Sequence, residues 1–241
     1  MIPQKERLGV GIRGAGQVSY EHAKAIRSNP RLYLAATCSR SRDSARKLAA
    51  EFDPGAKVYA RYEDLLADPE IDLVDVCNPT HAHPLTAVQA LRSDKHVLVE
   101  KPLDTTVEGC MEMIEATKRA GVLMQVDFHK RYDPEHIAME RRVSSGELGK
   151  ILYGSVCMED RIEVPVDWFP HWAPSSSPGW FLGVHFYDLV RWVMKSNGKT
   201  VFAQGRKETL KNDYNVDTYD SISAMVEFQN GAVVSFDTSW I

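Results

Sequence analysis

Long hydrophobic runs, a basic excess and paired cysteines are all missing from this chain of 241 residues. No apolar run approaches the roughly 18 residues that a membrane-spanning helix requires, so we expect no membrane partner. Lysine and arginine number 29 against 33 acidic residues, a net charge of −4, and no basic stripe suited to nucleic acid is visible. The segment from Met1 to Arg7 is polar and has no signal-peptide core, which predicts a cytoplasmic protein.

The cysteines are few and scattered, and no Cys-x-x-Cys motif occurs. Most lie in or beside strand-like runs, a pattern typical of buried reduced thiols rather than of disulfides or metal ligands. The four are Cys38, Cys77, Cys110 and Cys157. With 44% hydrophobic and 26% charged residues, the chain has the composition of a globular protein of one large or two modest domains.

The first half of the chain alternates short apolar runs with helix-compatible segments. Strands are expected at 8–12, 32–37, 57–59, 71–77, 97–99 and 122–128. Helices are expected between these strands. Thr105 and Glu108 are spaced as a capping box at the start of the last of these helices, which runs to Ala120. Such regular alternation predicts an α/β fold, a doubly wound parallel sheet covered by helices on both faces, over residues 1–128.

A glycine-rich turn follows the first expected strand. Gly14 permits the tight turn, and Gly16 permits the close approach of a pyrophosphate resting on the next helix N-terminus. The third glycine of this fingerprint is replaced by Ser19, a small residue that is compatible with close packing. The turn predicts a dinucleotide site that includes Gly14, Gly16, Gln17 and Val18.

The end of the second expected strand lacks the carboxylate that holds the ribose 2′-hydroxyl in NAD sites. Ser39 and Arg40 stand there instead, and a hydroxyl with a guanidinium suits a 2′-phosphate. These two residues therefore predict NADP as the cofactor, with NAD as the alternative. A solvated surface arginine is the structural alternative for Arg40.

Residues 96–102 run from an apolar strand into Glu100, Lys101 and Pro102. Ligands bind at the carboxyl ends of parallel strands, and burial lowers the pKa of a lysine toward neutrality. Lys101 is therefore a candidate general acid or base, and a surface Glu-Lys pair capping the strand is the alternative.

Residues 78–83 form another polar strand end at the same edge. We assign Asn78, Pro79 and His83 to the cofactor, with His83 beginning a helix beside the nicotinamide end. His81 and His83 resemble a metal-ligand pair, but no third ligand lies near them in the sequence, so no metal is expected.

The pattern of expected secondary structure changes at residue 129. Asp133 and Pro134 begin a helix, and long strands follow at 151–162, 200–207, 220–228 and 232–240. Asn230 and Gly231 join the last two strands as a hairpin. These features predict an α+β domain with a mixed, largely antiparallel sheet over residues 129–241.

Residues 164–178 form a long segment rich in proline, tryptophan and serine, and such loops are usually functional. Trp168 and Trp172 can stack on the apolar face of a substrate, while packing at a domain interface is an equal alternative. The loop leads into a helix on which His185 and Asp188, three residues apart, share a face.

Together these motifs resemble the Gfo/Idh/MocA oxidoreductases, named after glucose-fructose oxidoreductase and inositol dehydrogenase. The matching pieces are the glycine turn and residues 78–83, 95–102, 131–134 and 182–188, in order along nearly the whole chain. The resemblance implies hydride transfer between a nicotinamide cofactor and a hydroxyl or keto carbon of a sugar, glycoside or cyclic polyol. It implies that Lys101 and His185 handle the proton, that Glu100 and Lys101 contact the cofactor, and that Arg131 contacts the substrate.

Two features depart from the family pattern. The family commonly has an aspartate four residues before its histidine, where this chain has Phe181. Either another group assists His185, or the substrate differs, or catalysis is weakened. Family members also usually run longer, whereas this chain stops at Ile241, so we expect an incomplete second domain, from truncation or with a partner covering its edge. A homo-oligomer packed through the open sheet face is the assembly that the resemblance implies.

A non-catalytic dinucleotide-binding regulator or sensor is the alternative function. Phe181 and the short second domain favour it. Lys101 together with His185 disfavours it, because a pure binding protein needs neither. The Tyr-x-x-x-Lys pattern of Tyr20 and Lys24 is typical of short-chain dehydrogenases, but it lies in the first helix, which is the wrong place for that chemistry.

Overall fold

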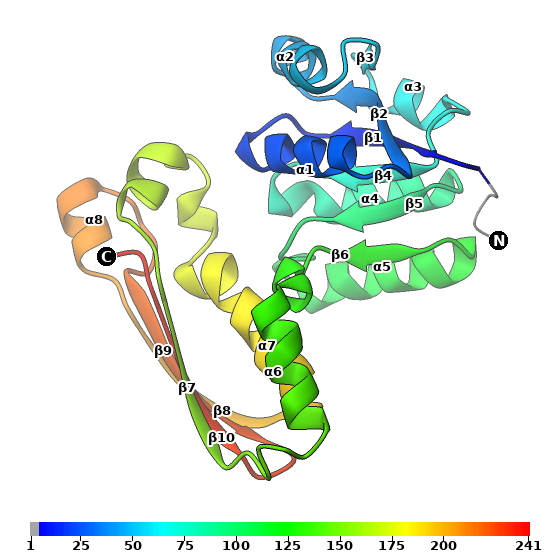
Figure 1. Cartoon of the computed structure of the whole chain (residues 1–241). Coiled ribbons are helices and arrows are strands. Elements are labelled where there is room, and N and C mark those ends of the chain that lie inside the picture. Colours follow the sequence, from blue (N-terminus) through cyan, green and yellow to red (C-terminus); the bar gives the residue numbers. More distant parts are fainter. Residues whose placement is uncertain (1–4) are drawn as a thin grey trace. The chain divides into compact units, whose positions relative to one another are not determined.

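The computed structural model describes residues 5–241 and divides into two compact units, the first ending at Asp127 and the second beginning at Phe128 (Figure 1). The boundary expected from the sequence lies after residue 128. No helix in the described part of the chain is long and apolar enough to cross a membrane.

The first unit is built on a six-stranded sheet in the order β3-β2-β1-β4-β5-β6, and every neighbouring pair in it is parallel. Its strands are β1 (Leu8–Arg13), β2 (Leu32–Cys38), β3 (Lys57–Tyr59), β4 (Leu73–Val76), β5 (His96–Val99) and β6 (Met124–Val126). The helices between them are α1 (Gln17–Ser28), α2 (Arg42–Phe52), α3 (Tyr62–Ala67), α4 (His83–Arg92) and α5 (Val107–Ala120). The expected doubly wound parallel sheet is confirmed.

Apolar side chains from the sheet pack into two separate clusters. Val10 and Ile12 of β1 are fully buried with side chains of α1 and α2. Val74 and Val97, from β4 and β5, are buried with side chains of α3, α4 and α5. Helices on both faces leave only the strand ends open to a ligand, which is where polar residues follow the strands.

The second unit contains a four-stranded sheet in the order β7-β10-β9-β8. Its strands are β7 (Tyr153–Glu159), β8 (Gly198–Arg206), β9 (Ser221–Phe228) and β10 (Val233–Ser239). β7 pairs with β10 in parallel, and the other pairs are antiparallel, so the expected mixed sheet is confirmed. The helices are α6 (Pro134–Ser144), α7 (Val184–Met194) and α8 (Thr209–Tyr214), with short helical segments η2 (His129–Tyr132), η3 (Val164–Trp168), η4 (Ala173–Ser175) and η5 (Gly179–Gly183).

Three local expectations meet different outcomes. Gly231 has φ +85° in the turn between β9 and β10, so the hairpin is confirmed. The cap of α5 is Thr106 rather than Thr105, because Thr106 Oγ1 accepts the backbone N–H of Gly109 at 3.1 Å. Residues 164–178 carry η3 and η4 instead of lacking structure, since their aromatic side chains pack together and fold the segment.

The two faces of the second sheet differ in cover. Phe236 of β10 is 2% exposed and packs with side chains of α7. On the opposite face, Phe202 of β8 pairs in register with Met225 of β9, and their exposures are 74% and 55%. The sheet therefore has one covered face and one apolar face open to solvent in this chain.

Replacing Phe236 with alanine is expected to lower the free energy of unfolding of the second unit by about 3–5 kcal/mol, because it opens a cavity. Leu148→Ala is the control, because this exposed residue lies outside the sheet in the same unit, and its effect should stay within about 0.5 kcal/mol. All five tryptophans lie beyond residue 128, so urea denaturation followed by tryptophan fluorescence reports on this unit. Equal effects of the two substitutions would contradict the assigned burial.

Candidate functional site

The polar residues that follow β1, β4 and β5 lie at one edge of the first sheet. Parallel pairing joins Arg13 to Val76, and Val76 to Val99, so these three strands end level with one another. The order of the sheet changes direction at β1 and β4, which is where open α/β sheets bind ligands.

The glycine turn after β1 is fixed by close packing. Gly14 has φ +118°, and a Cβ there would lie 2.5 Å from the Cys77 carbonyl. Gly16 has no heavy atom within 4 Å of its own Cβ position and is the N-cap of α1. No side chain in the described part of the chain caps this helix, and Gln17 and Val18 are exposed on its first turn. Open space at uncapped backbone N–H groups suits a phosphate.

Ser19 closes the turn from the other side. It is fully buried, and its hydroxyl donates to the Gly16 carbonyl. The small residue at the third fingerprint position therefore packs closely, as expected from the sequence.

The end of β2 places Ser39 half-buried and Arg40 exposed. A second arginine lies nearby that the sequence did not single out. Arg13 pairs in register with Cys38, donates through Nη1 to Cys38 Sγ at 3.2 Å, and lies over the Tyr62 ring. The sequence does not mark Arg13 as a site residue, because it lies inside the glycine-rich run. Only the parallel pairing of β1 with β2 brings Arg13 beside the end of β2.

Asn78 and His83 organise the loop after β4. Asn78 Nδ2 donates to Thr86 Oγ1 at 2.7 Å, while its buried Oδ1 has no hydrogen-bond partner among residues 5–241. His83 is buried at the start of α4, with Nδ1 2.9 Å from the Pro102 carbonyl and Nε2 2.8 Å from that of Asn78. Burial lowers the pKa of His83 because the neutral carbonyls do not offset its desolvation.

Two other residues of this loop differ from His83 in exposure. Pro79, directly before η1 (Thr80–Ala82), and His81, within η1, are both exposed. Both ring nitrogens of His83 contact backbone oxygens, so His83 links the loop after β4 to the segment after β5.

Glu100 and Lys101 follow β5. Glu100 is 7% exposed, and its Oε2 accepts the backbone N–H of Lys101 at 2.9 Å. Lys101 is half-buried beyond it. The strand therefore presents the lysine at the sheet edge, while the carboxylate turns back into the protein.

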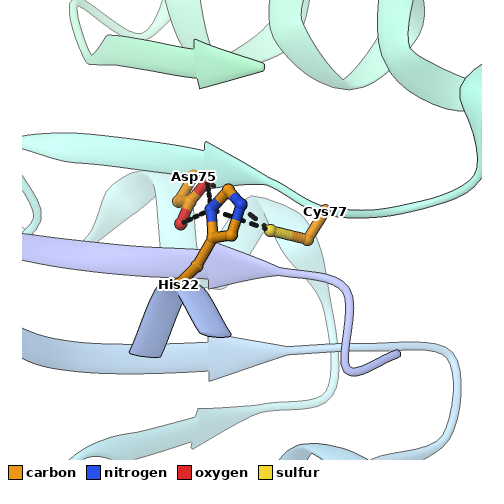
Figure 2. Close-up of side chains that lie close together, drawn as sticks. All are labelled: His22, Asp75 and Cys77. Carbon is orange, nitrogen blue, oxygen red and sulfur yellow. Dashed lines mark hydrogen bonds and ion pairs between the residues drawn. The ribbon is translucent and has the colours of Figure 1, made fainter. Parts of the chain in front are cut away.

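His22 of α1 is the residue of this edge that sequence reasoning missed. Its Nδ1 lies 2.9 Å from Asp75 and 3.6 Å from Cys77 Sγ. Figure 2 shows the Asp75 and Cys77 side chains beside the His22 ring. Its Nε2 lies 3.0 Å from Glu100 and 3.4 Å from Asp127. One sequence pattern could have predicted this cluster. A carboxylate lies in or directly after each of β4, β5 and β6, and a histidine lies on the first helix.

The charge states in this cluster follow from burial and partners. Burial alone would lower the pKa of His22, but hydrogen bonds with Asp127, Asp75, Cys77 and Glu100 outweigh it and raise the pKa far above its ordinary value. Burial raises the pKa of Cys77, so this residue is a thiol. The donor sets His22, Asp75, Cys77 and His22, Glu100, Asp127 also have the composition of a metal site.

In the second unit, Arg131 of η2 forms a two-pronged ion pair with Asp188 of α7, with Nε 2.7 Å from Oδ2. His185 of α7 is 6% exposed, and its ring meets that of His129 edge to face at 4.8 Å between centroids. The helical spacing of His185 and Asp188 therefore places a histidine and a fixed arginine side by side on α7 and η2.

The aromatic residues predicted to contact substrate separate into two environments. Trp168 is 50% exposed. Trp172 packs against Phe169 and Phe181, and Phe181 packs in turn against the fully buried Trp240. Phe181, at the position where the resemblance expects an aspartate, is thus part of an aromatic core.

The cysteines are free thiols in residues 5–241, but not all are buried as expected. Cys38 and Cys77 are buried, Cys110 is half-buried and Cys157 is exposed. Cys157 differs because alternate residues of β7 face the uncovered side of the sheet.

Residues 8–128 match the family described as "Oxidoreductase family, NAD-binding Rossmann fold", and residues 136–241 match the GFO/IDH/MocA C-terminal domain. The chain belongs to the Gfo/Idh/MocA family. The resemblance seen in the sequence is therefore confirmed, and the first unit is a Rossmann domain of the NAD-binding type.

Relatives in the Gfo/Idh/MocA family include scyllo-inositol 2-dehydrogenase (NAD(+)) of Bacillus subtilis, 30% identical, with 98% of this chain and 68% of that protein covered. Myo-inositol 2-dehydrogenase of Thermotoga maritima is 28% identical, with 96% and 68% covered. The structure of GenD2 from gentamicin A biosynthesis in complex with NAD matches with a TM-score of 0.88 and 27% identity, covering 100% of this chain and 69% of that one. The chain thus spans about two thirds of these relatives' length.

Gly14→Ala is expected to destabilise the first unit by at least about 2 kcal/mol, because the residue has positive φ and its Cβ meets the Cys77 carbonyl. Gly16→Ala is the control, and its cost should stay below about 1 kcal/mol, since nothing lies near its Cβ. Native-state hydrogen exchange of the β1 and β4 amides measures both. Similar costs at the two positions would show that the turn is not packed as described.

Proposed function

We propose that the protein is a dehydrogenase that uses a nicotinamide dinucleotide to oxidise a CH–OH group of a cyclic polyol or sugar, or to reduce the corresponding ketone. The observation that carries this proposal is the placement of Lys101 at the same sheet edge as the turn of Gly14 and Gly16. A dinucleotide lying along that edge has its pyrophosphate on α1 and its reactive end near β4 and β5.

The residues of the first unit fit such a cofactor. The open space at Gly16 admits a pyrophosphate, and the buried Oδ1 of Asn78 offers an acceptor to a donor group. We assign Gln17 and Val18 to the pyrophosphate, Ser39 and Arg40 to the adenosine ribose, and Asn78, Pro79 and Lys101 to the nicotinamide end. We assign His83 and Glu100 to the support of that end from within the protein, because both are buried and their polar atoms already have partners. Bound there, the nicotinamide supplies the acceptor for a hydride from the carbinol carbon.

The protein's own part is to handle the hydroxyl proton. A carbinol oxygen must lose its proton as the carbonyl forms, and a positioned basic group lowers that barrier. We assign this step to Lys101 and His185, as the family resemblance implies. An imidazole exchanges protons near neutral pH, and the ring of His185 is held against His129.

Arg131 and Trp168 are the proposed substrate contacts of the second unit. Asp188 keeps the Arg131 guanidinium fixed, and an oriented guanidinium suits vicinal hydroxyl groups. Trp172 is a weaker candidate because its ring packs against Phe169 and Phe181. Two relatives are named as inositol dehydrogenases, and we therefore propose an inositol as the first substrate to test.

A dinucleotide-binding sensor without catalysis is the second candidate. The aromatic packing of Phe181 favours it, because no carboxylate stands at that position to assist His185. We also propose a homo-oligomer formed through the exposed sheet face that carries Phe202 and Met225.

Lys101→Met and His185→Asn are each expected to lower kcat for NAD-dependent oxidation of myo- or scyllo-inositol by about a hundredfold or more, because each removes a proton acceptor. Lys118→Met is the control, since that lysine is exposed on α5 and pairs only with its neighbour Glu115 in the described contacts. Turnover is followed by NADH absorbance, and cofactor affinity by fluorescence titration. Full activity of Lys101→Met would refute the assignment, and native protein that binds cofactor without oxidising any polyol would favour the sensor.

The cofactor preference has its own test. The relatives whose names mention a cofactor have NAD, whereas Ser39 and Arg40 suit the 2′-phosphate of NADP. If Arg40 binds that phosphate, Arg40→Ala weakens NADPH binding about tenfold or more and leaves NADH binding unchanged. Arg42→Ala, on the first turn of α2, is the control. If native protein and Arg40→Ala bind NADPH with the same affinity, Arg40 is not part of the cofactor site.

A further inference from the structure

His22 joins the ends of three neighbouring strands through one side chain. Asp75 belongs to β4, Glu100 follows β5, and Asp127 follows β6, and all lie within 3.4 Å of a ring nitrogen of His22. The His22 side chain is 10% exposed, and those of Asp75 and Glu100 are 2% and 9% exposed. The Asp127 side chain is 20% exposed. The four groups therefore form a largely buried charge cluster beneath the sheet edge that carries Lys101.

The hydrogen-bond partners of His22 bear on how many protons its ring carries. A neutral imidazole carries one N–H, and an ionised carboxylate only accepts. Here a carboxylate lies 2.9 Å from Nδ1 and another lies 3.0 Å from Nε2, so an imidazolium can donate to both, whereas a neutral ring can donate to only one of them. An imidazolium also supplies positive charge among three carboxylates that would otherwise repel one another.

His83 shows that burial between two acceptors does not by itself favour a cation. Both of its nitrogens face neutral carbonyls, and burial lowers its pKa. His22 differs because its partners carry charge. A metal ion would have to displace a proton from a ring nitrogen that already has a carboxylate partner.

The Glu100 carboxylate divides its two oxygens between His22 and Lys101. Oε1 faces His22 Nε2 at 3.0 Å, and Oε2 accepts the Lys101 backbone N–H at 2.9 Å. Removing the donor at Nε2 leaves Glu100 Oε1 as a buried carboxylate oxygen without its partner, a costly state that a change of rotamer or protonation relieves. Either change disturbs the bond to the Lys101 amide.

We propose that His22 is a positioning residue, which holds Glu100 and through it sets the place of Lys101 at the sheet edge. Its catalytic consequence rests on the function proposed above. His22 itself contacts neither substrate nor cofactor in this assignment, so its loss should lower kcat and leave dinucleotide affinity nearly unchanged.

The charge of His22 can be measured on the unaltered protein. Nitrogen-15 NMR of histidine-labelled protein distinguishes an imidazolium from either neutral tautomer. We expect the imidazolium of His22 to persist above neutral pH, where an ordinary solvent-exposed histidine is neutral. A neutral His22 at pH 7, or a stoichiometric metal ion found in the purified protein by elemental analysis, would overturn the proposal.

Two amide substitutions separate positioning from mere stability. The side-chain nitrogen of glutamine is placed as Nε2 is in histidine, and that of asparagine as Nδ1 is. His22→Gln therefore keeps a donor for Glu100, whereas His22→Asn keeps one for Asp75. Both remove the charge, and Glu21→Gln, exposed on the same helix, is the control.

We expect His22→Asn to shift the Lys101 amide NMR signal and to lower kcat about tenfold or more, with cofactor Kd nearly unchanged. His22→Gln should retain most of both the signal position and kcat. If the two variants behave alike, or if Kd changes and kcat does not, His22 does not position Lys101. The amide signal needs no turnover, so it tests His22 even if the native protein oxidises no polyol and the proposed function fails.

Discussion

The parallel pairing of β1 with β4 and of β4 with β5 is the constraint on which the rest of the first unit depends. It brings three chain segments, far apart in the sequence, to a common edge where each strand ends. The pairing leaves Gly14 no room for a side chain, because the Cys77 carbonyl occupies that space. The same ladder of backbone hydrogen bonds thus sets the positions of the glycine turn, the loop of Asn78 and Lys101.

Electrostatics adds a second level of order at this edge. Carboxylates from β4 and from the ends of β5 and β6 would destabilise one another in a buried place, and His22 of α1 balances part of their charge. Because α1 also begins at the glycine turn, one helix contributes the proposed phosphate site at its start and the counter-charge a turn later. In the second unit, the pair of Arg131 and Asp188 fixes a cation beside His185 in a similar way.

Much of the fold could be predicted from the sequence, because local signals determine it. Apolar runs and the Asn230-Gly231 turn depend on neighbours in the chain, and the strands and the hairpin lie at or within a few residues of the expected positions. The candidate site was predictable only as a set of strand ends. The contacts of His22 and Arg13 come from register and helix packing across distant segments, and no spacing rule reports them. Trp172 shows the converse, since exposure of an aromatic residue cannot be judged before its neighbours are known.

The proposed reaction is a direct hydride transfer from a carbinol carbon to the nicotinamide. It can be tested with inositol deuterated at its ring carbons, incubated with the native protein and NAD. Direct transfer places deuterium at C4 of the nicotinamide in the product, where NMR detects it, and releases none to water. Reduced cofactor without deuterium, or no reduction although NAD binds, would show that the protein does not catalyse this transfer.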